Sequence, residues 1–308
     1  MQFPDINPFV PLLGPYEFTV AGAHIGPLGV RWYALAYIAG IVIGWRYALS
    51  MAATPRLWGG QTPTANKAQI DDLILWLTLA VVGGGRLGSM LFYNTHTLLT
   101  HPLETFQIWN GGMSFHGALI AVVIAVVLFS RANRIDMLRL GDLIAPCVPF
   151  GLFFGRIANF INGELWGRVT DVPWAMVFCN KTIMTEYGQC PAGMLPRHPS
   201  QLYEAGLEGV ALFLILRWAT HKAGWLQKRG ALTGLFLAGY GLARISLENV
   251  RQPDADMPVF PLGLTMGIML SVPMVLVGAW LIWRGLRGPA PEPESGPVSG
   301  SKPADPAA

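Results

Sequence analysis

Charged residues are scarce in this chain. Only 13% of its 308 residues are Asp, Glu, Lys or Arg, whereas 52% are hydrophobic, and the mean hydropathy is +0.42. Soluble globular domains carry about 25% charged residues. The composition therefore excludes an ordinary soluble protein and predicts a polytopic membrane protein.

Cysteine is also rare. The chain has three, Cys147, Cys179 and Cys190, which excludes a disulfide-dense scaffold and leaves no CxxC pair. No group of His, Asp and Glu has the spacing of metal ligands, so we expect no metal and no cofactor. Cys179 and Cys190 fall in one predicted external loop, where a disulfide can form in an oxidising compartment; the sequence leaves open whether they are bonded.

A cleavable leader is not expected either, because no Lys or Arg precedes Arg31 and the positive region of a signal peptide is missing. What the chain has instead is long apolar runs, each near the length of about 20 residues that spans a bilayer. They cover residues 28–49, 73–93, 115–130, 143–162, 201–220, 231–250 and 262–283. We therefore expect an all-α polytopic membrane protein with seven transmembrane helices.

Most of the 21 basic residues flank these spans on one side. The positive-inside rule then places the N-terminus outside, in the periplasm, and the C-terminus in the cytoplasm. Residues 1–27 would form an interfacial arm and residues 28–284 the membrane domain, with a small periplasmic head at 164–199. The Pro- and Ser-rich residues 285–308 are expected to be a disordered cytoplasmic tail. Because the basic residues are dispersed, no nucleic-acid partner is expected.

Three arginines, Arg86, Arg156 and Arg244, lie inside predicted spans at a similar depth near the external face. A charge at the centre of a membrane helix costs about 2.5–3.5 kcal/mol, and the nearby spans carry few acids to neutralise these three. A phosphate-containing anion is the predicted partner, because the guanidinium fork matches phosphate oxygens. The alternative for Arg156 is structural, with a carboxylate or helix-end carbonyls as its partners.

Other polar residues are predicted at the same level. On a helix Arg156, Asn159 and Gly163 would share one face, with Asn162 close by. Tyr240, Arg244 and Glu248 form a stripe at i, i+4 and i+8, which is either an ion pair alone or an ion pair that also serves a ligand. Gly83 to Gly85 are expected at a close-packing or kinked site. The starts of other spans add Tyr33, His116, Gln201, Tyr203 and Glu204.

His116 opens the third span and is the first candidate if a base is needed, because its ordinary pKa is close to neutral. A histidine at a helix start is also commonly a structural hydrogen-bond donor, and both readings remain open.

The run GRIANFINGE at residues 155–164 resembles the prolipoprotein diacylglyceryl transferase family of bacteria, as do GGMSFHG at 111–117, RHPSQLYE at 197–204 and the Tyr240 stripe. The similarity covers about residues 30–283. It implies an enzyme of the bacterial inner membrane that takes the diacylglyceryl group of phosphatidylglycerol. The group would pass to the lipobox cysteine thiol of a prolipoprotein signal peptide, forming a thioether and releasing glycerol-1-phosphate, in the first step of lipoprotein maturation.

The same resemblance implies roles for particular residues. Arg156 and Arg244 would bind phosphate, and His116 would activate the thiol. Asn162, Gln201 and Tyr203, from the polar layer itself, are further candidates for binding phosphatidylglycerol. The family's remaining functional residues fall on Tyr33, Asn159, Glu164, Gly167, Tyr240 and Glu248.

Two alternatives come from other classes. A transporter or channel for an organic anion would have polar residues continuing to the cytoplasmic face and an internal repeat, and neither is visible. A phosphatidyltransferase would need a metal-binding set of aspartates, which the sequence lacks.

Overall fold

The computed structural model describes residues 1–11, 13–20, 23–107, 112–252 and 264–288, and this part of the chain is mostly helical. A helix or a run of joined helices occupies each of the seven apolar stretches. Their bounds are α1 Trp32–Ala52, α2 Lys67–Phe92, α4 Phe115–Ala132, α5 Met137–Ile144 continued through η4 Ala145–Cys147 into α6 Val148–Ile161, α8 Ser200–Glu204 continued through η5 Ala205–Ala211 into α9 Leu212–His221, α10 Ala231–Leu247 and α11 Met266–Arg287.

By length and composition, four helices of the described part can cross a membrane: Trp32–Ala52, Lys67–Phe92, Met137–Ile161 and Met266–Arg287. His116–Ala132 and Ala231–Leu247 are shorter apolar helices. Large apolar side chains also face outward, including Leu79 and Leu276, which are 64% and 65% exposed. Such a surface suits lipid, and the chain is a polytopic membrane protein.

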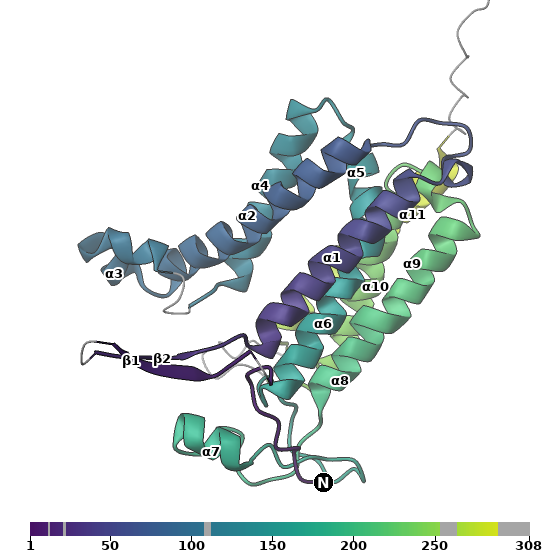
Figure 1. Cartoon of the computed structure of the whole chain (residues 1–308). Coiled ribbons are helices and arrows are strands. Elements are labelled where there is room, and N and C mark those ends of the chain that lie inside the picture. The colour runs from purple at the N-terminus through teal and green to yellow at the C-terminus, as the bar shows by residue number, and fades with distance from the viewer. Residues whose placement is uncertain (12, 21–22, 108–111, 253–263, 289–308) are drawn as a thin grey trace, which may run out of the picture.

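The prediction of an all-α chain is wrong for the N-terminal arm. Strands β1 (Tyr16–Val20) and β2 (Ala23–Leu28) pair as an antiparallel hairpin, with Thr19 opposite His24. The hairpin projects beside the start of α1 (Figure 1). Aromatic and β-branched residues in the segment YEFTV favour an extended chain.

The helices form two groups (Figure 1). In the main bundle α1 packs on α6, α6 on η5, and α10 on α11, whereas α2 packs mainly on α4 in a pair that diverges from the bundle. The pair is tight because glycines meet: a Cβ on Gly88 would lie 2.5 Å from Gly117 Cα. Gly84 also faces Gly117, which confirms close packing at the glycine run.

The largest hydrophobic core lies at the end of the bundle where α1, α5, α9 and α10 meet. It contains Met51, Trp58, Leu143, Leu216 and Leu232. Next to this core, the Asp142 side chain of α5 caps the N-terminus of α10. It accepts hydrogen bonds from the backbone N–H of Gly230 at 2.6 Å and of Thr233 at 2.8 Å. This end of the bundle is thereby fixed, and the polar residues of interest lie toward the other end.

A head lies between α6 and α8. It contains the short helix α7 (Lys181–Tyr187), capped by Asn180, and a small core of Phe3, Phe178, Ile183 and Ala192. Cys179 and Cys190 are joined by a disulfide, with their Cα atoms 5.4 Å apart, so the pair that the sequence left open is bonded.

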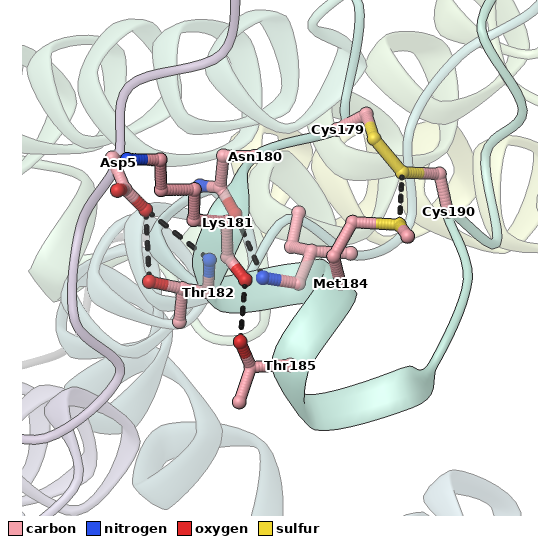
Figure 2. The surroundings of a disulfide bond; sticks show 9 residues. Asp5, Cys179, Asn180, Lys181, Thr182, Met184, Thr185 and Cys190 are labelled. Carbon is pink, nitrogen blue, oxygen red and sulfur yellow. Dashed lines mark hydrogen bonds between the residues drawn. A yellow bond between two sulfur atoms is a disulfide. The ribbon is translucent and has the colours of Figure 1, made fainter.

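The disulfide closes the segment that carries α7, and the N-terminal arm holds the same segment from the other side (Figure 2). Asp5 accepts a hydrogen bond from the Thr182 hydroxyl at 2.8 Å, and Met184 Sδ lies 3.3 Å from Cys190 Sγ. The arm and the head are therefore one packed unit. The disordered tail was predicted from residue 285, but α11 continues to Arg287. The residues from 289 onward lie outside the described part.

Candidate active site

The signature run 155–164 forms the end of α6 and the turn that follows. Gly163 has φ +65, and its N–H bonds to the Phe160 carbonyl at 3.0 Å, while the Glu164 N–H bonds to the Asn159 carbonyl at 3.1 Å. This is a Schellman C-cap, in which glycine takes the left-handed position. The helix ends at Ile161, so the prediction that Gly163 continues the face of Arg156 and Asn159 is wrong.

This turn returns the chain toward the helix and builds the first polar cluster, which we call the amide cluster: Tyr33, Asn159, Asn162, Glu164 and Gln201. Asn159 Nδ2 donates to Glu164 Oε1 at 3.0 Å and to the Tyr33 hydroxyl. Asn162 Nδ2 lies 3.4 Å from the same carboxylate oxygen, and Gln201 donates to the Glu164 carbonyl. Helix α1, the α6 C-terminus and α8 therefore present their polar groups together.

The second cluster, which we call the ionic cluster, surrounds Arg156 three residues earlier on α6. Its Nε lies 2.7 Å from Glu204 Oε2 and its Nη2 lies 3.3 Å from Glu208 Oε2. Both glutamates are fully buried. The expectation that few acids would neutralise the arginines is therefore wrong for Arg156, because α8 and η5 bring two carboxylates to one guanidinium.

The stripe on α10 adds to the ionic cluster. Arg244 Nη2 and Glu248 Oε2 form the expected i,i+4 ion pair at 3.3 Å. Tyr240 interacts electrostatically with both Arg156 and Arg244, so the two guanidiniums border a common region. Arg244 Nη1 is buried and has no hydrogen-bond partner among the described residues. A buried donor of this kind is costly unless a ligand or water satisfies it.

Gly167 lies where three segments cross. Its N–H donates to the His198 carbonyl at 2.9 Å, and it pairs with Arg251 beyond α10. A Cβ at this position would lie 2.5 Å from the Val250 carbonyl oxygen and 2.6 Å from His198 Cβ. Only glycine fits, because the backbone segments after α6, before α8 and after α10 touch here.

Three candidates lie outside these clusters. Arg86 is on α2 and donates to the carbonyls of Glu104 at 2.7 Å and Thr105 at 3.1 Å, so it fastens the segment after α3 (Thr95–Thr100). His116 is exposed in the first turn of α4, which packs mainly on α2. Arg86 is thus bound to backbone carbonyls on the diverging pair and not to the ionic cluster, while the common depth of the three arginines stays a prediction.

Tyr203 is the third. Its hydroxyl accepts from Trp174 Nε1 at 2.6 Å and lies 3.3 Å from His198 Nδ1, so its contacts are to the head. It faces the head although Glu204, the next residue, faces Arg156.

Two residues of the ionic cluster were not among the sequence candidates, Glu208 and Arg251. Arg251 Nη1 donates to Glu204 Oε1 at 2.8 Å, and its backbone forms an isolated β-bridge with Gly167, so Arg251 links the cluster to that segment. For Glu208 the sequence did contain a signal, because an acid inside an apolar span predicts a charged partner from another segment. Which partner it meets depends on α6 and on the residues after α10.

The fold and the site define a class of protein: a polytopic membrane protein that holds buried guanidinium, carboxylate and amide groups near one end of its helix bundle. A family model described as prolipoprotein diacylglyceryl transferase matches residues 21–284. The chain belongs to this family, and the resemblance seen in the sequence is confirmed.

Its similar relatives carry one name, phosphatidylglycerol–prolipoprotein diacylglyceryl transferase. The protein of Caulobacter vibrioides is 59% identical, with 94% of this chain and 96% of that protein covered. The protein of Phenylobacterium zucineum is 58% identical with the same coverage, and that of Rhodopseudomonas palustris is 52% identical, with 91% of this chain and 95% of the relative covered.

Proposed function

We propose that this chain transfers the diacylglyceryl group of phosphatidylglycerol to the lipobox cysteine thiol of prolipoproteins, the first step of bacterial lipoprotein maturation. The thiol sulfur bonds to the glycerol carbon, and the bond from that carbon to the phosphate oxygen breaks. Glycerol-1-phosphate leaves, and the thiol proton is released. The names of the relatives and their coverage of this chain support the reaction.

The observation that carries the site assignment is the unpartnered Arg244 Nη1. A buried guanidinium nitrogen of this kind is suited to a phosphate oxygen, and no carboxylate of the described residues bonds to it. Negative charge grows on the phosphate as the carbon–oxygen bond breaks. Fixed cationic donors in a dry site stabilise that charge better than water does, so Arg156 and Arg244 are proposed to bind the headgroup phosphate.

The amide cluster is proposed to orient the rest of the headgroup. Asn159 and Glu164 hold each other and the Tyr33 hydroxyl in fixed positions, which is what a site for a glycerol group needs. Glu248 would orient Arg244, and Gly167 would keep the adjoining backbone close. Asn162, Gln201, Tyr203 and Tyr240 remain proposed headgroup contacts.

His116 is proposed to act on the attacking thiol. An ordinary cysteine has a pKa of about 8.5 and reacts as the thiolate, so a nearby base or cation speeds attack at neutral pH. His116 would contact the peptide from the α2–α4 pair, whereas the ionic cluster belongs to α6, α8, η5 and α10.

The finer placement in the membrane is also part of the proposal. Seven spans, an external N-terminal arm and head, and a cytoplasmic C-terminus fit the distribution of basic residues, and the membrane is proposed to be the bacterial inner membrane. The ionic cluster would then lie within the outer leaflet, at the level of an outward-facing headgroup.

The test is product identity. Purified protein is incubated with phosphatidylglycerol and a peptide bearing a lipobox cysteine, and the peptide is examined by mass spectrometry. We expect a diacylglyceryl thioether and free glycerol phosphate from the wild type, and neither from Arg244→Ala. An unmodified peptide, together with solute movement across vesicles containing the protein, would favour an organic-anion transporter instead.

A further inference from the structure

Glu208 belongs to an unusual turn. It lies on η5, a π-helix between α8 and α9, and such turns are frequent at functional sites. Its side chain is fully buried, with Oε2 3.3 Å from Arg156 Nη2 and Oε1 without a hydrogen-bond partner among the described residues. The wide turn brings Glu204 and Glu208 to the same guanidinium.

The ionic cluster is electrically balanced. Ion pairs connect three guanidiniums with three carboxylates: Arg156, Arg244 and Arg251 with Glu204, Glu208 and Glu248. An anionic headgroup bound among them would add one negative charge that no member of this set offsets. Excess charge is expensive in a buried, low-dielectric site, and buried groups commonly change protonation rather than remain unpaired.

Among the three acids, Glu208 can take a proton at the smallest loss. Glu204 has both oxygens in ion pairs, at 2.7 Å to Arg156 and 2.8 Å to Arg251, and Glu248 is the carboxylate paired with Arg244. Glu208 and Glu248 each have one ion-pair contact of 3.3 Å, but Glu208 shares Arg156 with Glu204, whereas Glu248 is the one carboxylate paired with Arg244 among the described residues. Its protonation removes the repulsion between two carboxylates on one guanidinium.

Charged and titratable groups from three neighbouring helices lie close to Glu208. They are Arg156 from α6, Glu204 from α8, and Tyr240 and Arg244 from α10. The charged residues of α9, Arg217 and His221, lie at its far end.

We propose that Glu208 is a positioning residue that takes up one proton when an anionic lipid headgroup binds to the ionic cluster. The proton keeps the site neutral and loosens Glu208 from Arg156, whose Nη1 and Nη2 can then face the phosphate together. The inference rests on the proposed function for the identity of that headgroup, phosphatidylglycerol. A phosphodiester stays anionic at any ordinary pH, so the proton must come to the protein.

The experiment uses the purified full-length protein in detergent micelles with a saturating lipobox peptide. The KM for phosphatidylglycerol and kcat are measured from slightly acidic to alkaline pH, and the thioether is counted by mass spectrometry. For the wild type we expect KM to rise with pH by up to about tenfold per unit, because binding is linked to uptake of one proton. Glu208→Gln, which has the shape of the protonated acid, should show a KM independent of pH.

Two further measurements complete the design. Glu186→Gln is the matched control, because Glu186 is a glutamate of the head, paired with Arg31 3.2 Å away, and it should keep the wild-type pH slope. Calorimetry of phosphatidylglycerol binding in buffers of different ionisation enthalpy should count about one proton taken up by the wild type and none by Glu208→Gln.

A wild-type KM that does not change with pH, equal slopes in wild type and Glu208→Gln, or calorimetric uptake of no proton by the wild type would each overturn the inference. The calorimetric result on the wild type stands even if Glu208→Gln fails to fold. A wild type that forms no thioether at any pH would instead overturn the proposed function, so the two failures are distinguishable.

Discussion

Replacing Arg156 by alanine should damage stability and transfer by different amounts, and the structure gives a magnitude for each. The substitution leaves Glu204 and Glu208 buried without the guanidinium that they share. Breaking a buried ion pair by removing one partner costs about 3–5 kcal/mol. Because two carboxylates lose a partner, we expect a loss near the upper end, about 5 kcal/mol. The proposed phosphate contact adds a loss of about 1.5–3 kcal/mol in transition-state binding, roughly ten- to a hundredfold in transfer.

The double variant Arg156→Ala/Glu208→Gln separates the two effects. Removing one stranded charge should restore about 2 kcal/mol of the lost stability, while transfer stays low because the phosphate ligand is still missing. Thermal unfolding in micelles and the thioether assay measure the two quantities on the same preparations. Arg229→Ala is the matched control: that arginine pairs with the single carboxylate of Asp136 and is half-exposed, so it should cost about 0–1 kcal/mol and leave transfer intact. Recovery of transfer in the double variant would refute a direct role for Arg156.

Three further predictions follow. His116→Gln should reduce transfer about 10²- to 10⁴-fold at neutral pH if His116 is the base, with recovery as rising pH ionises the thiol, and near-normal turnover at neutral pH would remove that role. Gly167→Ala should cost about 1–3 kcal/mol of stability, because its Cβ would lie 2.5 Å from the Val250 carbonyl, and thermal unfolding checks this. Arg229 beside Asp136 holds the pKa of that carboxyl below its ordinary value. The ion pair therefore stabilises the fold above the ordinary pKa of the carboxyl group, and this stabilisation is lost as the pH falls through the lowered pKa. Asp136→Asn removes the titrating group, so the stability of this variant, measured by unfolding at a series of pH values, should fall less in acid than that of the wild type.

Local patterns in the sequence determine much of this protein. The apolar runs decide where helices form, since the backbone in lipid is satisfied only by helices and closed barrels, and runs of about 20 apolar residues have the length of a helix. The run NFINGE ends α6, because Gly163 alone accepts the left-handed position that returns Glu164 to Asn159. Arg244 and Glu248 pair because a helix turn separates them. The Arg244–Glu248 pair was predicted from this spacing. The turn at Gly163 was not predicted, because the apolar run by itself favours a helix that continues past Ile161.

For buried charges that lie far apart in the sequence, tertiary structure alone decides which ones pair. Three arginines at one predicted depth look equivalent, yet Arg86 binds carbonyls on the diverging α2–α4 pair, while Arg156 meets Glu204 and Glu208 on a helix run some fifty positions away in sequence. The π-turn of η5 and the approach of α8 to α6 set that pairing. Depth along a span can be read from the chain because helix rise is constant, whereas the facing of one helix toward another depends on how all of them pack.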